Sequence, residues 1–230
     1  MRNVTGLVVM MLALTMATTA TVTEKEARRI ADAATVLQEI RSAPDGDISE
    51  RLWEKASCVA VIPSVKKAAF IVGGEYGKGL VSCRSGAHWS APSFLVLQKG
   101  SWGLQIGGET IDLVLLVMNE RGLSRLLHNK VALGGEASVA AGPLGRDARA
   151  LTDAQLKAEI LSYSRSQGVF AGVDVTGGVL KPDEDDNFDL YGRPVTATDL
   201  LLTNSVEAPP AVGAFMAALQ RGKRAEPPRD

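Results

Sequence analysis

The sequence has few of the side chains from which metal sites and catalytic centres are built. Its only cysteines are Cys58 and Cys83, its only histidines are His88 and His128, and it has no CxxC motif. A zinc site takes cysteine and histidine ligands at close spacing, so none is expected. The GxSxG turn that carries the nucleophile of α/β-hydrolases is also absent. We therefore expect a protein that is not an enzyme and that needs no metal or cofactor.

Charge of one sign and aromatic residues are also scarce. The net charge is −1, and aromatic residues make up 5% of the 230 residues. Proteins that bind nucleic acid carry an excess of basic residues, so we expect no nucleic-acid partner. A chain of this length with 46% apolar residues can bury one good core. Its 23 glycines indicate tight turns and close backbone packing.

The longest apolar run lies at the N-terminus, between Val4 and Ala17. It follows the positive charge of Arg2 and precedes small residues that end at Ala20. The run is shorter than the roughly 20 residues of a membrane-spanning helix and is typical of a signal peptide. We predict a signal peptide over residues 1–20 and a periplasmic or secreted mature protein, with an uncleaved membrane anchor as the alternative.

Export would place the two cysteines in an oxidising compartment. Cys58 and Cys83 lie in neighbouring strand-like runs, and the chain has no other thiol. We therefore predict that they form a disulfide.

The remaining pattern predicts one α+β domain over residues 21–205. Residues 23–41 form an amphipathic helix, in which Thr23 and Glu26 have the spacing of a capping box. Its expected apolar stripe is Ala27, Ile30, Ala31, Ala34, Leu37 and Ile40. From Cys58 onward, short β-rich runs punctuated by glycine and proline predict a mostly antiparallel sheet, bent by glycines, with short peripheral helices. Residues 206–230 are expected to form a short C-terminal helix and a polar tail.

The triplet Gly-Gly-Glu occurs at residues 73–75, 107–109 and 134–136. A phosphate cradle, a metal site and a structural turn are three possible roles. A P-loop needs Ser or Thr after its lysine and then a helix, whereas the first copy is followed by a strand-like run. We therefore predict that all three copies are structural features at strand ends or bulges.

A cluster of acidic residues and one isolated carboxylate are candidate functional residues. Asp183, Asp185, Asn187 and Asp189 alternate like the opening of a calcium-binding EF-hand, but the glycine and the final glutamate of that loop are missing. We predict a solvated acidic loop that binds Ca²⁺ no better than millimolar. Asp112 begins a strongly apolar run. We expect it to accept hydrogen bonds from a turn, or alternatively to line a pocket.

Several stretches in order resemble the SYLF-domain family. They are "AVIPSVKKAAFIVGGEYGKG" from Ala60, "WSAPSF" from Trp89, "GLQIGGETIDLVLLVMN" from Gly103, "AAGPLGR" from Ala140, "SYSRSQGVFAGVDVTGGVL" from Ser162 and "YG" at Tyr191. The resemblance covers most of residues 30–205. It implies binding of phospholipids and, for the fungal members, association with actin. The exported form is similar to bacterial members.

The resemblance also implies that an N-terminal amphipathic helix and basic surface residues contact the membrane. On this chain the candidate lipid-binding residues are Arg28, Arg29, Lys66, Lys67 and Lys78. Two alternatives remain for the helix: insertion of Ile30, Leu37 and Ile40 into lipid, or packing on the domain's own sheet. The lysines are either a head-group patch or an ordinary solvated hairpin. We expect binding of anionic phospholipid at the bacterial cell envelope, with an exported protein–protein interaction module as the alternative.

Overall fold

The computed structural model describes residues 22–42, 48–69, 72–102, 107–127, 130–145, 151–166, 168–203 and 205–220. The helices are α1 (Glu24–Ser42), α2 (Glu50–Lys55), α3 (Glu120–Leu126), α4 (Asp153–Lys157), α5 (Glu184–Tyr191), α6 (Ala197–Leu201) and α7 (Gly213–Gln220), with a 3₁₀ turn, η2, at Pro210–Val212. The strands are β1 (Cys58–Ala69), β2 (Val72–Ser85), β3 (His88–Trp89), β4 (Ser93–Trp102), β5 (Gly107–Val117), β6 (Val131–Ala132), β7 (Val139–Ala141), β8 (Ile160–Ser166), β9 (Val169–Gly172) and β10 (Gly178–Pro182). The signal peptide predicted for residues 1–20 and the tail after Gln220 lie outside these ranges.

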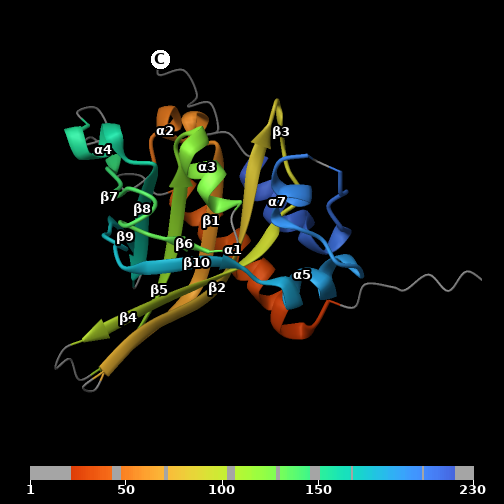
Figure 1. Ribbon diagram of the computed structural model, residues 1–230, viewed down its shortest axis with the longest axis horizontal. Coiled ribbons are helices and arrows are strands. Elements are labelled where there is room, and N and C mark those ends of the chain that lie inside the picture. Colours follow the sequence, from red (N-terminus) through yellow and green to blue (C-terminus); the bar gives the residue numbers. More distant parts are fainter. Residues whose placement is uncertain are drawn as a thin grey trace, which may run out of the picture.

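The described strands form one ten-stranded sheet. Its main order is β6-β10-β4-β2-β1-β5-β8-β7, while β3 pairs with β2 and β9 pairs with β8 beside this path. The pairs are antiparallel except β7 with β8. The far ends of β1, β2 and β4 project beyond the helices (Figure 1). The predicted α+β fold with a mostly antiparallel sheet is confirmed.

Both faces of the central strands are buried. Val59 and Val61 pack on the side that α1, α2 and α7 cover. Ala60 and Ile62 pack with residues of α3 and α6 on the opposite side. Successive side chains of a strand point to opposite faces. Burial on both faces therefore explains why these strands read as nearly continuous apolar runs instead of alternating ones.

Helix α1 begins with the predicted capping box. The Thr23 backbone N–H donates to Glu26 Oε2 at 2.8 Å, and the Glu26 N–H donates to Thr23 Oγ1 at 3.3 Å. Ile30, Leu37 and Ile40 are at most 2% exposed and belong to the core that the helix shares with the sheet and α7. The helix therefore packs on the domain itself. Among the described residues, no helix is long and apolar enough to cross a membrane.

The apolar stripe predicted for α1 was partly wrong. Ala27 and Ala31 are exposed, whereas Ala33 and Val36 are buried. Each residue advances about 100° around a helix. The buried arc is centred between the Ala33 and Leu37 positions, so Ala27 and Ala31 fall beyond its edge.

Strand β1 contains a bulge at Pro63 and Ser64. Val61 pairs with Leu80 and Lys66 with Tyr76, so five steps along β1 oppose four along β2. The same extra residue appears against β5, where Ile62 pairs with Leu113 and Val65 with Ile111. Ser64 has φ = 53°, and no other non-glycine residue in the described ranges has a positive φ. A bulge bends its strand and increases the local twist.

Glycines in β2 let β1 approach closely at this bend. A Cβ added at Gly79 would lie 2.1 Å from the Val61 carbonyl oxygen and 2.7 Å from the Ile62 Cα. A Cβ at Gly77 would lie 2.7 Å from an Ile62 methyl carbon. The sheet is therefore bent where glycines face the bulge. A sheet bent by glycines was predicted, but not the position of the bend.

The Gly-Gly-Glu copies lie at strand ends or in a turn, as predicted. Two copies start β2 and β5, and Gly134 in the third has φ = 81° in a turn after β6. The first two glutamates flank Lys67 across the sheet, because Lys67 pairs with Glu75 on β2 and with Glu109 on β5. Lys99 on β4 continues this row beside Glu75. Opposite charges on neighbouring strands stabilise the pairing.

Cys58 and Cys83 form the predicted disulfide. They are direct partners across β1 and β2, and both are fully buried. The bridge joins positions separated by 25 residues, so it closes the β1–β2 hairpin near its base.

We expect Gly79→Ala to lower the free energy of unfolding by about 2 kcal/mol or more, because the new methyl group overlaps the β1 backbone, which cannot rotate away. Gly100→Ala is the matched control, because nothing lies within 4 Å of its added Cβ. Urea unfolding of both variants measures the difference. Equal midpoints for the two would contradict the close approach of β1 and β2.

We expect the protein as recovered to contain no free thiol. Mass measurement after alkylation in denaturant, without reductant, should find neither Cys58 nor Cys83 labelled. Replacing both cysteines by alanine should lower the free energy of unfolding by about 3 kcal/mol, because the bridge restricts the unfolded chain. Two labelled thiols would refute the bridge.

Candidate functional site

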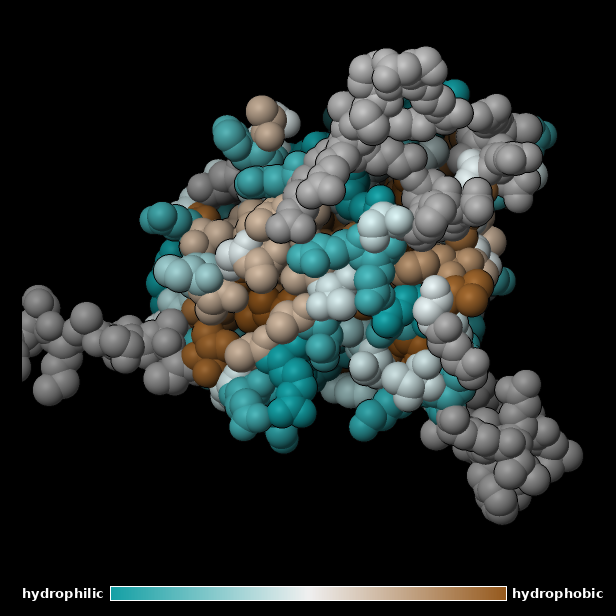
Figure 2. All heavy atoms as spheres, turned by 180° about the vertical axis from the view of Figure 1, so that it is seen from behind, coloured by the Kyte–Doolittle hydropathy of each residue, from teal (hydrophilic) through white to brown (hydrophobic). Residues whose placement is uncertain are grey.

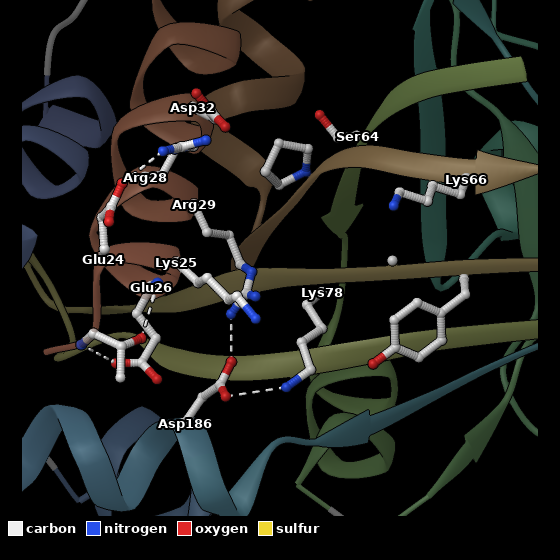
Figure 3. A pocket seen from close by; sticks show the side chains of 14 residues that line it. Glu24, Lys25, Glu26, Arg28, Arg29, Asp32, Ser64, Lys66, Lys78 and Asp186 are labelled. Carbon is white, nitrogen blue, oxygen red and sulfur yellow. Dashed lines mark hydrogen bonds and ion pairs between the residues drawn. The ribbon is translucent and has the colours of Figure 1, made fainter.

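A cleft of about 900 Å³ lies above the bulge in β1. Its walls are formed by three parts of the chain that are distant in sequence (Figure 3). They are the first turns of α1, the hairpin of β1 and β2 at the bulge, and the first turn of α5. The polar side chains that shape it include Lys25, Arg28, Arg29, Ser64, Lys66, Tyr76, Lys78 and Asp186. The bulge places Pro63 and Ser64 in the cleft wall.

The cleft brings together four of the five predicted lipid-binding residues. Arg28 and Arg29 come from α1, Lys66 from β1 and Lys78 from β2. Lys67 does not line it. Adjacent strand residues point to opposite faces, and Lys67 instead lies 3.8 Å from Glu109 through its Nζ, within the charge row described above.

Sequence reasoning missed two further residues of the cleft. Lys25 lies one turn before Arg28 and Arg29 on α1, and Tyr76 lies two residues before Lys78 on β2. Helical spacing and strand alternation place each of them on the same face as a predicted residue. Tyr76 is 46% exposed, which is unusual for a large apolar side chain on a strand of the core sheet.

Two of the cations are held by carboxylates of α5 and its cap. Lys78 Nζ lies 3.0 Å from Asp186 Oδ1 and 2.5 Å from Asp183 Oδ2. Arg29 Nη1 forms a close ion pair with the other carboxylate oxygen of Asp186. Burial alone would lower the pKa of Lys78, but hydrogen bonds and negative charge from Asp183 and Asp186 outweigh it and raise the pKa above its ordinary value. Lys78 therefore remains charged at neutral pH.

The other cations of the cleft form a weak ion pair or none within the described residues. Arg28 pairs with Glu24 at 2.8 Å, but both side chains are largely exposed, so the pair is weak. Lys25 and Lys66 are exposed, and their ammonium groups have no ion-pair partner within the part of the chain that the structure describes. Five cations and four carboxylates line the cleft, a net charge of +1. The cations are Lys25, Arg28, Arg29, Lys66 and Lys78, and the carboxylates are Glu24, Glu26, Asp32 and Asp186.

The prediction of a solvated acidic loop was wrong. Residues 184–191 form α5, and Asp183 caps it. Acidic residues in the first turn stabilise a helix N-terminus. Asn187 is buried and accepts the Phe94 backbone N–H at 2.7 Å. In the described ranges no group of three or more His, Cys, Asp or Glu side chains is arranged to hold a metal ion.

Asp112 accepts a hydrogen bond from the bulge, as expected. The Ser64 backbone N–H donates to Asp112 Oδ1 at 2.9 Å. The other oxygen lies 3.4 Å from Arg165 Nε. Burial raises the pKa of the Asp112 carboxyl; the hydrogen bond from Ser64 opposes this rise and the charge of Asp32 adds to it, so the net shift is upward. Asp112 thus acts on the cleft indirectly, by holding the bulge.

The fold and the cleft define a small α+β domain with a cleft lined by both signs of charge. A family model described as "Ysc84: Las17-binding protein actin regulator" matches residues 98–222, more than half of the chain. The chain therefore belongs to the Ysc84 family, and the resemblance to SYLF-domain proteins is confirmed. The matched range includes Asp186 but none of the cations of the cleft.

Individual relatives extend the similarity over more of the chain. SH3 domain-containing protein PJ696.02 of Schizosaccharomyces pombe is 39% identical over 145 residues, which cover 61% of this chain and 34% of the relative. Protein YSC84 of Saccharomyces cerevisiae is 33% identical over 180 residues, covering 76% and 38%. The human SH3 domain-containing YSC84-like protein 1 is 33% identical over 182 residues, covering 77% and 53%. The chain thus spans about a third to a half of the length of these relatives.

Proposed function

We propose that this protein binds anionic phospholipid head groups through the cleft and does so without catalysis. One observation carries the proposal. Arg28, Arg29, Lys66 and Lys78 are supplied by three separate elements, yet they line the same cleft. Exposed Lys66 and Lys25 provide charge that no carboxylate in the described ranges neutralises by a direct ion pair.

The binding we propose is electrostatic and does not depend on insertion of α1. Ile30, Leu37 and Ile40 are in the core, so exposing them would require α1 to leave the sheet. Each cation near an anionic membrane surface contributes about 1 kcal/mol. Hydrophobic and hydrophilic residues both occur on the described surface seen from behind (Figure 2). Binding should therefore be weak and should decrease as salt increases.

We place this binding at the bacterial cell envelope. The N-terminal apolar run supports export. A buried disulfide fits an oxidising compartment. Cleavage after Ala20 would leave α1 and the cleft in the mature protein.

A protein partner is the second candidate. The family description names Las17 binding and actin regulation, and a cleft with both signs of charge also suits a protein surface. Vesicle flotation with phosphatidylcholine alone, and with added phosphatidylglycerol, separates the candidates. Salt-sensitive, saturable binding to the anionic vesicles supports lipid binding, whereas no binding at low salt favours the protein partner.

The most discriminating test of lipid binding compares variants of two adjacent residues on β1, Lys66 and Lys67. We expect Lys66→Gln to weaken binding to phosphatidylglycerol vesicles by roughly fivefold, the equivalent of one surface cation. Its dependence on salt should also become shallower. Lys67→Gln removes the same charge from the opposite face and should bind like the parent protein.

The pair controls for net charge and for position along the chain. Circular dichroism of both variants checks that the fold is kept. An equal loss in the two variants would show that the cleft is not the lipid-binding surface, because only overall charge would then matter.

A further inference from the structure

Asp186 lies between two of the cations that the proposed function assigns to lipid. Its Oδ1 is 3.0 Å from Lys78 Nζ, and its Oδ2 is paired with Arg29 Nη1. The carboxylate thus joins α1 to β2 across one end of the cleft (Figure 3). Its side chain is 12% exposed and faces the cleft.

Two cations that hold two oxygens of one anion form the arrangement that binds phosphate in proteins. We propose that Arg29 and Lys78 form a phosphate subsite and that Asp186 is its internal competitor. This inference rests on the proposed function and refines it: the phosphate of a bound ligand reaches the two cations only when the Asp186 carboxylate turns away.

The surroundings allow Asp186 to leave without loss of α5. Asp183 remains 2.5 Å from Lys78, and it caps the helix by accepting the backbone N–H of Asp186, which rotation of the Asp186 side chain leaves in place. Asn187 anchors the helix to β4 through the Phe94 backbone N–H. Rotation of one side chain at the first turn therefore suffices, and the helix keeps its cap and its buried anchor.

Competition of this kind selects the ligand by charge density. A phosphate diester carries one negative charge, as the carboxylate does, and gains little by replacing it. A phosphate monoester carries about −1.5 to −2 charges at neutral pH and offers three acceptor oxygens. The subsite therefore favours a terminal phosphate monoester, such as the head group of phosphatidic acid, or a free phosphate ion of the same chemistry.

The test compares Asp186→Asn with Asp185→Asn. Asp185 is exposed on the same helix and makes no contact with the cations, so both variants change the net charge equally. We expect Asp186→Asn to bind phosphatidic acid vesicles roughly fivefold to tenfold more tightly than Asp185→Asn does. Phosphatidylglycerol vesicles should show a smaller difference. Calorimetry with inorganic phosphate separates a soluble phosphate ligand from a lipid one.

Equal affinities of the two variants, or weaker binding by Asp186→Asn with its fold intact, would overturn the inference. A second measurement uses the parent protein and covers the case in which Asp186→Asn fails to fold. Carbon NMR should show the Asp186 carboxyl resonance shifting as phosphatidic acid of short chain length is added, while that of Asp185 stays in place. An unmoved Asp186 resonance on saturation would reject displacement.

The outcomes also separate this inference from the proposed function. If the parent protein binds anionic vesicles and the two variants are alike, lipid binding stands and the competitor is rejected. If no form binds vesicles but Asp186→Asn binds inorganic phosphate more tightly than Asp185→Asn, the subsite stands as a site for soluble phosphate and the lipid proposal fails.

Discussion

The hydrogen bond from the Ser64 backbone N–H to the Asp112 carboxylate holds the bend in β1 on which the cleft depends. The bend needs room on the next strand, which Gly77 and Gly79 provide by lacking a Cβ. It turns the strand so that Ser64 and Lys66 face the first turns of α1. The Asp112 side chain is only 17% exposed, and a partly buried carboxylate is costly unless it is paired. Asp112 accepts the backbone N–H of Ser64, which the bulge removes from the regular hydrogen bonding between β1 and β5.

Some cations of the cleft are paired with carboxylates of the protein, and others are not. Lys78 and Arg29 are held by Asp183 and Asp186, which fix α5 on the sheet and on α1. Lys66 has no such partner in the described ranges, and so it is available to an anion at once. The same fold therefore contains cations that are paired with carboxylates and cations that we propose for recognition, and Asp186 is paired with two of the first group. A cleft that used all its cations for structure would have no reason to attract phosphate.

Much of the fold could be predicted from local patterns, whereas the site could be predicted only in part. The capping box at Thr23 marked the start of α1 within a residue. The apolar runs marked the buried strands. In contrast, adjacent Lys66 and Lys67 look alike in sequence, and only the strand register places them on opposite faces. The acidic helix was predicted as a loop although Asp183 at its N-cap and Gly192 at its C-cap are local helix signals. The partners of Asp186, in contrast, lie 108 and 157 residues away. No local pattern reports a pairing at that separation.

The most direct test of the cleft as the binding site is an amide NMR titration with phosphatidic acid of short chain length, below its micelle concentration. We expect the largest shifts at Ser64, Lys66 and Lys78, and we expect the affinity to fall as salt is added. Lys67 and Glu109, on the far face of the same strands, should shift little. Shifts that centre on the row of Lys67 and Glu109 and leave the cleft unchanged would contradict the account.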